Sequence, residues 1–376
     1  MKTPTVYDVA ERAQVSIASV SRVLRSPDSV REETRERVME AVRFLGYVPS
    51  ANARGLAARR TNVIGLFFPG HDDVDGPATG YPEASDDVPI IVDDGAPDFE
   101  MENLYFDEVL RGAEIEAWRH GFALMVAAGR GASKDALVSD IAGRVDGLAV
   151  LARTVPDELL AHVARRIPVV VLAGSERVDE FDHVSSSNRA GMKALAAHVF
   201  REHSPVVTFY VSGPDDSPDA VERFQGFEDA VGDGVVENVE VLKGDFTRER
   251  GSVVARELVG RGGFDTPGSF LARLLNQREK PAGKAAIVCA NDQMALGVLD
   301  VLEEVGVRVP EDVVVTGFDG IAAGRHSRPR LTTVHQPMVE LGRAAIHAIT
   351  ARLEDPNRTP QSLTLPVQVV LRDSCP

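Results

Sequence analysis

Residues 5–24 read TVYDVAERAQVSIASVSRVL, and this stretch carries the signals of two short helices joined by a tight turn. Thr5 followed three residues later by Asp8 is typical of the capping box that starts a helix. Apolar residues then recur at the spacing of one helix face, at Val6, Val9, Ala10 and Ala13. Gln14 and Val15 form the predicted turn, and Ser16 can cap a second helix that runs to about Leu24.

The second predicted helix has an inner and an outer face. Its inner face consists of Val20, Val23 and Leu24, while Ala18 and Arg22 point outward and Ile17 and Ser21 lie at the borders. A third helix is predicted over 32–45, with a buried stripe of Val38, Ala41, Val42 and Leu45 and with Gly46 at its C-terminal end. Three such helices predict an all-α helix-turn-helix domain at the N-terminus.

The outer face of the second helix fits the major groove of DNA. Arg22 can pair with O6 and N7 of guanine, which discriminates between bases by roughly 1–3 kcal/mol. Ile17 and Ala18 can touch only a thymine methyl group or the groove wall. Ser16, Ser21 and Tyr47 are candidates for phosphate contacts, which position a protein without reading sequence. The pattern alone leaves Arg22 open as a solvated charge and Ile17 as peripheral core.

The charge is distributed unevenly along the chain. The 376 residues have a formal net charge of −16, but residues 1–60 contain eleven basic and seven acidic side chains, so the remainder carries −20. A basic head on an acidic body indicates that only the head meets a polyanion. The sequence contains no apolar run of about 18 residues and begins without a secretory signal. We therefore expect a cytoplasmic protein with no membrane partner.

Cysteine and histidine usage limits the chemistry that we expect. The two cysteines, Cys289 and Cys375, are too few for a disulfide framework or a cysteine-rich zinc site. The nine histidines are scattered without nucleophile or metal spacing, and the sequence lacks Gly-x-Ser-x-Gly, His-Glu-x-x-His and phosphate-binding glycine loops. The prediction is therefore no enzymatic activity, no cofactor and no metal site.

Strand-like and helical segments alternate from residue 63 onward. The predicted strands are Val63–Phe68, Phe122–Ala127, Gly147–Leu151, Val169–Ala173, Val206–Val211, Ala286–Ala290, Val313–Phe318 and Val367–Arg372. Helical patterns between them include Phe106–Trp118, Asn188–Phe200 and Asp292–Glu304. The alternation predicts parallel sheets covered on both faces. Because this part is too long for one core, we expect two lobes with a ligand in the cleft between them.

Two stretches, 5–24 and REETRERVMEAVRFLGYVPSANARGLAARRTNVIGL (31–66), resemble the N-terminus of the lactose-repressor (LacI/GalR) family of bacterial transcription regulators. The resemblance continues through nearly all of the chain. It implies a helix-turn-helix domain, a hinge and an α/β two-lobed, periplasmic-binding-protein-like effector domain. The DNA-contacting residues that we expect on this basis are Thr5, Tyr7, Ser16, Ile17, Ala18, Ser21, Arg22, Tyr47, Asn52 and Leu56.

The head departs from the family pattern at three positions. Gln14 stands where glycine is usual, Arg25 where asparagine is usual, and Arg31 where a serine caps the third helix. The two arginines add positive charge close to the DNA backbone, which favours non-specific affinity.

Residues 49–60 are predicted to form a hinge between head and body. Ala51–Ala58 spans two helical turns, which are too short to be stable alone, and Gly55 lowers helix stability by up to about 1 kcal/mol more. In the family such a helix orders on operator DNA, where a leucine wedges into the central base step of the minor groove. Leu56 occupies that position here. The alternative is a flexible linker with an incidental leucine.

Three groups of motifs carry the resemblance in the body. They are Asn188-Arg-Ala-Gly, Arg223-Phe-Gln-Gly-Phe227, and the pair Asn291-Asp-Gln-Met-Ala-Leu-Gly297 and Thr316-Gly-Phe-Asp319 followed by Leu331-Thr-Thr-Val-His-Gln-Pro. The resemblance implies effector contacts from Tyr105, Phe106, Arg223, Phe246, Asn291 and Asp319. A planar guanidinium suits a bidentate grip on a diol, and an aromatic ring stacks on the apolar face of a sugar.

Each effector residue also has a structural alternative. Asp319 could cap a turn, Phe246 could be core, and Arg223 could be a salt-bridge partner. Ala173 and Gly174 follow a strand where the family often places an acidic residue that binds hydroxyls. This departure leaves a different sugar, a larger ligand or a non-sugar open, and carbohydrate remains the expected class.

The predicted domain organisation follows from these features. The helix-turn-helix domain covers 1–48, the hinge 49–60, and the effector-binding and dimerisation domain 61–376. Its lobes are expected at 61–186 plus 320–352 and at 187–319 plus 353–376. Residues 70–102 contain eleven acidic and no basic side chains, and we expect them to be an inserted acidic loop.

The expected function is a ligand-responsive repressor that binds a palindromic operator as a homodimer. After Val367–Arg372 the sequence has no leucine-heptad tail of the kind that joins dimers into tetramers. One alternative is a transport-type sugar-binding receptor, which would need export and would leave the basic head without a role. An enzyme is a second alternative, and the motif search above gives it no support.

Overall fold

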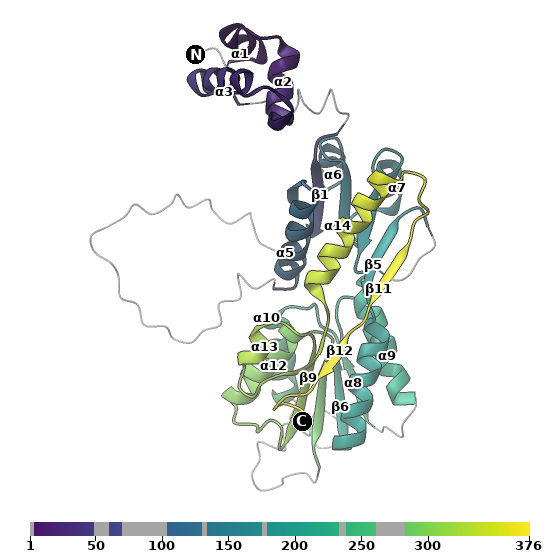
Figure 1. Ribbon diagram of the computed structural model, residues 1–376. Helices are drawn as coiled ribbons and strands as arrows, with labels where there is room; N and C mark the ends of the chain where they lie inside the picture. The colour runs from purple at the N-terminus through teal and green to yellow at the C-terminus, as the bar shows by residue number, and fades with distance from the viewer. Residues whose placement is uncertain are drawn as a thin grey trace, which may run out of the picture. The chain divides into compact units, whose positions relative to one another are not determined.

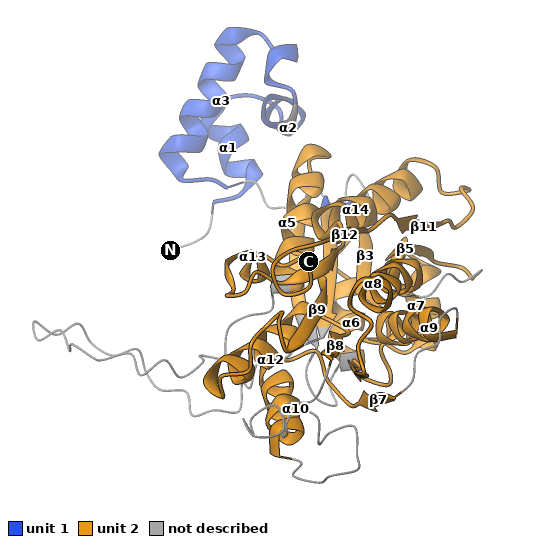
Figure 2. Cartoon of the chain, turned by 90° about the horizontal axis from the view of Figure 1, so that it is seen from below, with its two compact units in different colours: residues 1–62 blue, residues 63–376 orange. Residues whose placement is uncertain are grey.

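The computed structural model describes residues 4–48, 60–69, 104–129, 134–174, 179–232, 238–260 and 283–376. The chain divides into two compact units, residues 1–62 and 63–376 (Figure 2). Asn52 and Leu56 of the predicted hinge, and the acidic segment 70–102, lie outside the described residues. Within the described ranges no helix is long and apolar enough to cross a membrane.

The first unit contains the three predicted helices. They are α1 (Val6–Ala13), α2 (Ile17–Arg25) and α3 (Glu32–Leu45), with a short 3-10 helix, η1 (Pro27–Ser29), between the last two. Their buried faces form one small core of Val9, Ala10, Ala13, Val20, Val23, Val38 and Ala41. This core confirms the helix periods read from the sequence, because every member lies on a predicted inner face.

Local capping sets where these helices begin. The Thr5 backbone N–H donates to Oδ2 of Asp8 at 2.7 Å, and the Asp8 N–H donates to Oγ1 of Thr5 at 3.4 Å, which confirms the capping box. Oγ of Ser16 accepts from the Ser19 N–H at 3.1 Å at the start of α2. Gln14 adopts a left-handed conformation with φ of 52°, which explains why glycine is favoured there. Arg31 makes no side-chain cap on α3.

The second unit contains two six-stranded sheets. The first has the strand order β11-β5-β4-β3-β1-β2 and is parallel throughout. Its strands are β1 (Val63–Pro69), β2 (Ala123–Gly129), β3 (Gly147–Leu151), β4 (Val169–Leu172), β5 (Asp182–Ser186) and β11 (Ser362–Leu365). The helices that cover it are α5 (Leu104–Arg119), α6 (Lys134–Ala142), α7 (Asp157–Ala164) and α14 (Met338–Glu354).

Alternation along β1 shows how this sheet is covered on both faces. Ile64 and Leu66 belong to the core that also contains residues of α5 and α14, whereas Phe67 belongs to a separate core with residues of α6 and α7. Successive side chains of a strand point to opposite faces, so a strand that is apolar at every position requires a helix layer on each side. Figure 1 shows α5 and α14 lying side by side on one of these faces.

The second sheet has the order β12-β10-β9-β8-β6-β7 and is parallel except for β12, which runs antiparallel to β10. Its strands are β6 (Val207–Val211), β7 (Val239–Leu242), β8 (Ala285–Cys289), β9 (Val313–Asp319), β10 (Thr332–His335) and β12 (Gln368–Val370). The associated helices are α8 (Asn188–His203), α9 (Pro218–Gly232), α10 (Arg248–Gly260), α12 (Asp292–Glu304) and α13 (Ala323–His326). In Figure 1, α8 and α9 lie on one side of this sheet and α10 and α12 on the other.

The structure assigns two segments to a different lobe from the one predicted. β10 pairs with β9, so residues 332–335 belong to the second lobe and not to the first, and β11 pairs with β5, so residues 362–365 belong to the first and not to the second. The chain therefore passes between the sheets three times, after β5, after β10 and after β11. β10 and β11 are four residues each. β10 joins the sheet of the strand directly before it, β9, whereas β11 pairs with β5, which lies far earlier in the sequence.

Candidate functional site

The outer face of α2 carries the predicted base-reading side chains. Ile17, Ala18 and Arg22 are all exposed, and Ile17 keeps 41% of its surface accessible. Ser21 and Tyr47 are half-buried, and Tyr7 on α1 is exposed. This face therefore presents Arg22, flanked by small and apolar residues, to whatever lies against it. That is the arrangement of a helix that enters a major groove.

Two of the predicted DNA-contacting residues, Thr5 and Ser16, also have structural roles. Oγ1 of Thr5 donates to Oδ2 of Asp8 at 2.6 Å, and Oγ of Ser16 lies 2.9 Å from Oγ of Ser19. Both hydroxyls belong to helix caps, which hold the first turns of α1 and α2 in place. The first N–H groups of α2 have no partner within the helix, and such groups are suited to bind a phosphate oxygen.

Arg223 is the centre of a polar cluster at the carboxyl edge of the second sheet. It lies on α9 and is 2% exposed. Its Nε donates to Oδ1 of Asn188 at 2.9 Å, and its Nη1 donates to the Ala290 carbonyl at 2.8 Å and lies 3.1 Å from Oδ1 of Asp319. Nη2 lies 3.9 Å from Oδ2 of Asp219, which is too long for a hydrogen bond. Nη2 is therefore the edge of the guanidinium best placed to meet a ligand.

Close helix packing holds Arg223 in this position. Gly226 follows it by one helical turn on α9, and a Cβ at Gly226 would overlap the carbonyl oxygen of Arg189 on α8. The glycine of the Arg-x-x-Gly-aromatic motif therefore lets α8 and α9 approach closely enough for Arg223 to reach Asn188. The Arg223 guanidinium also lies 3.9 Å from the centroid of the Phe318 ring, a cation–π contact.

Two carboxylates face the guanidinium. Burial raises the pKa of Asp319 to about 6, against the opposing effects of Arg223 and of the Gln336 amide, which donates to Oδ1 of Asp319 at 2.7 Å. Burial likewise raises the pKa of Asp219, opposed by Arg223 and by the Asn188 amide. Two buried acids beside one buried cation supply acceptors and donors to which ligand hydroxyls can hydrogen-bond.

Asn291 and Asp292 together start α12 beside the cluster. Oδ1 of Asn291 accepts from the Met294 N–H at 3.0 Å, and its Nδ2 donates to the Phe246 carbonyl at 2.9 Å. Asn291 is thus an N-cap, and the prediction that it contacts a ligand stays a prediction. Phe246 is half-buried with φ of 73°, and the Arg223 guanidinium lies 5.7 Å from its ring centroid.

Asp292 is fully buried and fixes the turn after β9. It accepts from the N–H groups of Gly320 and Ile321 at 2.8 and 2.9 Å and from Oγ1 of Thr333 at 2.5 Å. A Cβ at Gly317 would overlap this carboxylate, which accounts for the glycine of the Thr316-Gly-Phe-Asp319 motif. Asp292 therefore holds Asp319, whose own φ is 116°, where Arg223 can reach it.

The first lobe contributes two aromatic residues at the start of α5. The Phe106 ring lies 4.9 Å from that of Phe68 at the end of β1, and the Tyr105 ring lies 5.3 Å from that of Phe106. Burial raises the pKa of Tyr105, and the nearby carboxylates of Asp219 and Asp319 raise it further. The carboxylates of the second lobe thus influence Tyr105 electrostatically, and a ligand contact from Tyr105 stays a prediction.

Sequence reasoning did not select Asn188, Asp219, Asp292 or Gln336 as site residues. Asp219 and Arg223 are four residues apart on α9, a spacing at which opposite charges on a helix meet. Asn188 and Asp292 stand in motifs that carry the family resemblance, but no role was predicted for either residue. Gln336 also stands in a recognised motif, Leu331-Thr-Thr-Val-His-Gln-Pro, but its role comes from contacts with Asp319 and with Oγ of Ser186, at 2.9 Å, which cross the chain by 17 and 150 residues.

Comparison with known proteins establishes the family to which this chain belongs. Residues 5–50 match the model of bacterial regulatory proteins of the lacI family, and residues 196–375 match a periplasmic binding protein-like domain. The HTH-type transcriptional repressor PurR of Escherichia coli O1:K1 / APEC is 30% identical over 377 residues, which cover 98% of this chain and 96% of that protein. This chain belongs to the lacI family of bacterial regulatory proteins. It is a ligand-responsive, DNA-binding regulator of transcription.

Solved structures of the lacI family share the fold. The complex of the transcriptional regulator CelR with cellobiose is 26% identical with a TM-score of 0.64, covering 99% of both chains. The lac repressor dimer bound to operator and the anti-inducer ONPF is 23% identical with a TM-score of 0.73, covering 100% of this chain and 99% of that one. These matches confirm the helix-turn-helix head and the two-lobed, periplasmic-binding-protein-like body.

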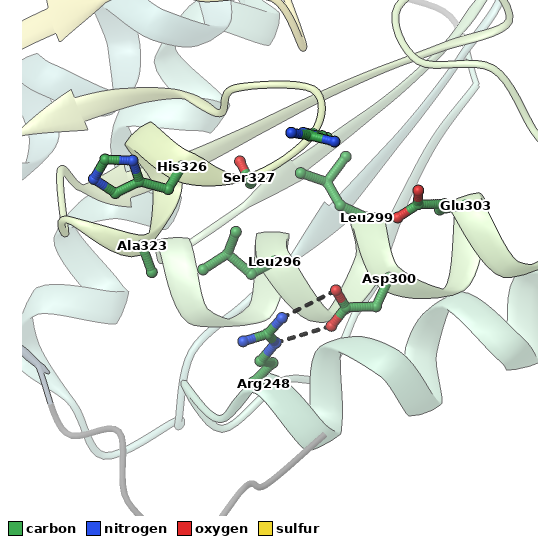
Figure 3. A pocket seen from close by; sticks show the side chains of 9 residues that line it. Arg248, Leu296, Leu299, Asp300, Glu303, Ala323, His326 and Ser327 are labelled. Atoms are coloured by element: carbon green, nitrogen blue, oxygen red, sulfur yellow. Dashed lines mark hydrogen bonds and ion pairs between the residues drawn. The ribbon is translucent and has the colours of Figure 1, made fainter. Parts of the chain in front are cut away.

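A pocket of about 280 Å³ lies elsewhere on the second lobe of this lacI-family protein (Figure 3). Its lining comes from α10, α12 and α13, and it includes none of the six predicted effector residues. Arg248 donates from Nε and Nη2 to the two carboxylate oxygens of Asp300 at 2.8 and 3.0 Å across one side of it. This pocket is separate from the Arg223 cluster.

Proposed function

We propose that this lacI-family regulator represses transcription by binding a two-fold symmetric operator as a homodimer, under the control of a carbohydrate held around Arg223. The observation that carries the ligand proposal is the Arg223 cluster itself. One guanidinium, the carboxylates of Asp219 and Asp319, and the rings of Phe246 and Tyr105 combine charged groups for hydroxyls with apolar faces for a sugar ring. The bound cellobiose of the CelR complex supports this class of ligand.

A hydrogen-bond relay connects the cluster to the crossing between lobes. Gln336 donates to Asp319 and accepts from Oγ of Ser186, the last residue of β5 before the chain enters the second lobe. A ligand that takes over Asp319 changes the partner of Gln336 and hence the contact with Ser186. Ligand binding thereby changes the arrangement of the two lobes, and the arrangement of the lobes in turn determines the position of the hinges.

Exposed apolar side chains on the first lobe support the homodimer. Ile115 and Trp118 on α5 keep 36% and 80% of their surface accessible, and Val126 on the edge strand β2 keeps 48%. Tryptophan is enriched in protein interfaces because it buries a large area with few torsions to order. A two-fold dimer also matches an operator with two half-sites. We place this activity in the cytoplasm and expect no catalysis; turnover of a candidate ligand by the pure protein would contradict that.

The test is a selection of duplex DNA from a random pool at one fixed, near-physiological salt concentration. Fixed salt matters because phosphate contacts make affinity steeply salt-dependent. Enrichment of a two-fold symmetric site is the expected result, followed by release or tightening when sugars are added. Enrichment of a single asymmetric half-site would refute the dimer, and no sugar response across a broad panel would refute the carbohydrate.

Arg22→Ala tests how the head reads DNA. We expect base preference to relax at one position in each half-site, by roughly 1–3 kcal/mol, because Arg22 is exposed on α2. The matched control is Arg37→Ala, an exposed arginine of α3 for which we expect a uniform loss across sequences. Unchanged base preference in Arg22→Ala would remove Arg22 from the base-reading residues.

Leu56→Ala tests the proposed wedge. We expect specific binding to weaken more than non-specific binding, because unstacking a base step is useful only at a site that bends. Binding of the selected operator and of a scrambled duplex, measured side by side, gives the answer. Equal losses on both duplexes would contradict the wedge.

A further inference from the structure

A second cluster of chemistry-bearing side chains lies in the second lobe at the far end of α8 from Asn188. His198 and His203 are on the last turns of α8, and Cys375 is brought beside them from the end of the sequence. Each of the three offers one ligand atom, and these atoms lie within 4.8 Å of one another. The cluster does not involve the Arg223 site, and the inference drawn from it does not depend on the proposed effector.

His198 contains an unsatisfied polar atom. Its Nε2 is buried, and it has no hydrogen-bond partner among the residues that the structure describes. Buried polar atoms in folded proteins almost always have a partner, so such an atom calls for an explanation, of which an unrecorded ion is one. Because the ring stands 6.1 Å from that of His203, a shared ion between the two histidines is within reach.

Cys375 is held firmly where the histidines can use it. It has no accessible surface and packs with Val199 of α8. Its carbonyl accepts from Oγ1 of Thr332 at 2.9 Å, and the preceding residue, Ser374, donates from Oγ to the Val315 carbonyl at 2.6 Å and accepts from the Val315 N–H at 3.1 Å. The thiol is therefore pre-organised by hydrogen bonds to two strands, not carried on a loose end.

His203 has a partner that prepares it for a metal. Its Nε2 lies 3.0 Å from the oxygen of Pro376. A neutral imidazole that donates from Nε2 keeps its lone pair on Nδ1, and a second hydrogen bond of this kind orients most metal-binding histidines. The three candidate ligands include no carboxylate, so the cluster is not the acid-rich type that prefers calcium or magnesium.

We propose that His198, His203 and Cys375 form a zinc site that clamps the segment around Cys375 onto α8. Two imidazoles and one thiolate are ligands that Zn²⁺ prefers, and three protein ligands leave a fourth position for water. Zinc bonds of about 2.0–2.3 Å in a tetrahedron place ligand atoms roughly 3.3–3.8 Å apart, so side-chain shifts of about 1 Å suffice. On binding, a Zn–S bond forms and the thiol proton passes to solvent.

A rival cluster lacks these properties. Glu116, His120 and His347 also bring three possible ligand atoms together. However, Oε2 of Glu116 lies 3.2 Å from Nε of Arg343 and 3.4 Å from Nη1 of Arg119. Two guanidinium groups already neutralise that carboxylate, and they oppose a metal cation by charge repulsion.

The experiment titrates tag-free, full-length protein, stripped with a chelator, with Co²⁺ and then with Zn²⁺ in competition. We expect one equivalent of Co²⁺ with a thiolate-to-cobalt charge-transfer band, displaced by Zn²⁺. Cys375→Ser should lose the band, and His198→Gln should bind at least about tenfold more weakly. The matched controls are Cys289→Ala, the other buried cysteine, and His162→Gln, an exposed histidine of α7, and both should behave as the parent protein.

Several results of this titration would overturn the zinc-site proposal. Absence of the charge-transfer band in the folded parent protein overturns the proposal, as does an unchanged band in Cys375→Ser or unchanged affinity in His198→Gln. Circular dichroism establishes that each variant is folded. If Cys375→Ser does not fold, the proposal is tested by two measurements: the charge-transfer band of the parent protein, and the Co²⁺ binding of His203→Gln, a substitution at a half-buried position.

Discussion

Replacing Arg223 by methionine is the most informative single change in the effector-binding unit. Methionine keeps the length of the side chain and removes the guanidinium, which is 2% exposed. The Oδ1 atoms of Asn188 and Asp319 and the Ala290 carbonyl then lose a charged donor at 2.8–3.1 Å. Asp319 and Asp219 are left facing each other without the cation between them.

The expected loss is about 3–5 kcal/mol in the free energy of unfolding of residues 63–376, because removing one partner of a buried pair leaves an uncompensated charge. This is a large share of the roughly 5–15 kcal/mol that stabilises an ordinary domain. Losing the guanidinium also raises the pKa of Asp319, which Arg223 holds down against burial. The variant should therefore lose less stability at pH 5, where Asp319 is protonated, than at pH 8.

Urea unfolding followed by circular dichroism measures this loss at both pH values. Adding Asp319→Asn to Arg223→Met should recover part of the stability, since it removes the uncompensated charge. The control is Arg189→Met, which breaks an exposed bidentate pair with Asp229 between the same two helices and should change stability far less. Equal losses in Arg223→Met and Arg189→Met, or no benefit from the second substitution, would refute the buried-pair reasoning.

Two further predictions concern Asp292 and Arg31. Burial and the nearby Asp319 raise the pKa of Asp292 to about 8 in the folded protein, so its contribution to stability is full below the unfolded pKa near 4 and is lost as the pH rises through 8. Between pH 6 and 8 the free energy of unfolding should fall by about 2 kcal/mol for this reason. Asp292→Asn, which mimics the protonated acid, should abolish this fall when urea unfolding is measured at the two pH values. A parallel decline in the variant would exclude Asp292 as the cause. Arg31→Ser should stabilise α3 by about 1 kcal/mol, because Arg31 makes no side-chain cap, as hydrogen exchange of the α3 amides would register. Arg37→Ser, in the middle of α3, should slow no amide, and slower exchange in both variants would mean that charge and not capping is responsible.

Local signals predicted the head and most of the strands. Capping residues and apolar periods place α1 and α2, and the apolar period and Gly46 place α3, because these effects act within one or two turns of the chain. In the body, β1, β3 and β9 stood out as continuous apolar runs, which strands covered on both faces require. The short strands β7 and β11 did not, because each is four residues long with exposed positions.

The site was only partly predictable for a related reason. Arg223 and Asp319 could be selected because the resemblance gives their motif positions a ligand contact. Gln336 also stands in a motif, but its role could not be predicted, since it comes from contacts made across the fold. Asn291 turned out to cap α12, which a ligand-based interpretation of the motif does not reveal.

By itself, the sequence determined the helix-turn-helix head, the alternation of strands and helices in the body, and the family, because these depend on neighbours a few residues apart and on motifs that can be recognised in one dimension. Only the tertiary structure decided which lobe receives β10 and β11, how Gln336 connects Asp319 to Ser186, and that Cys375 meets His198 and His203. Histidines and a cysteine that look scattered along the chain become one cluster once the last residues pair beside β9. The Gln336–Ser186 contact and the cluster of Cys375 with the two histidines bring together residues more than a hundred positions apart, and they arise from packing of whole elements that no local pattern encodes.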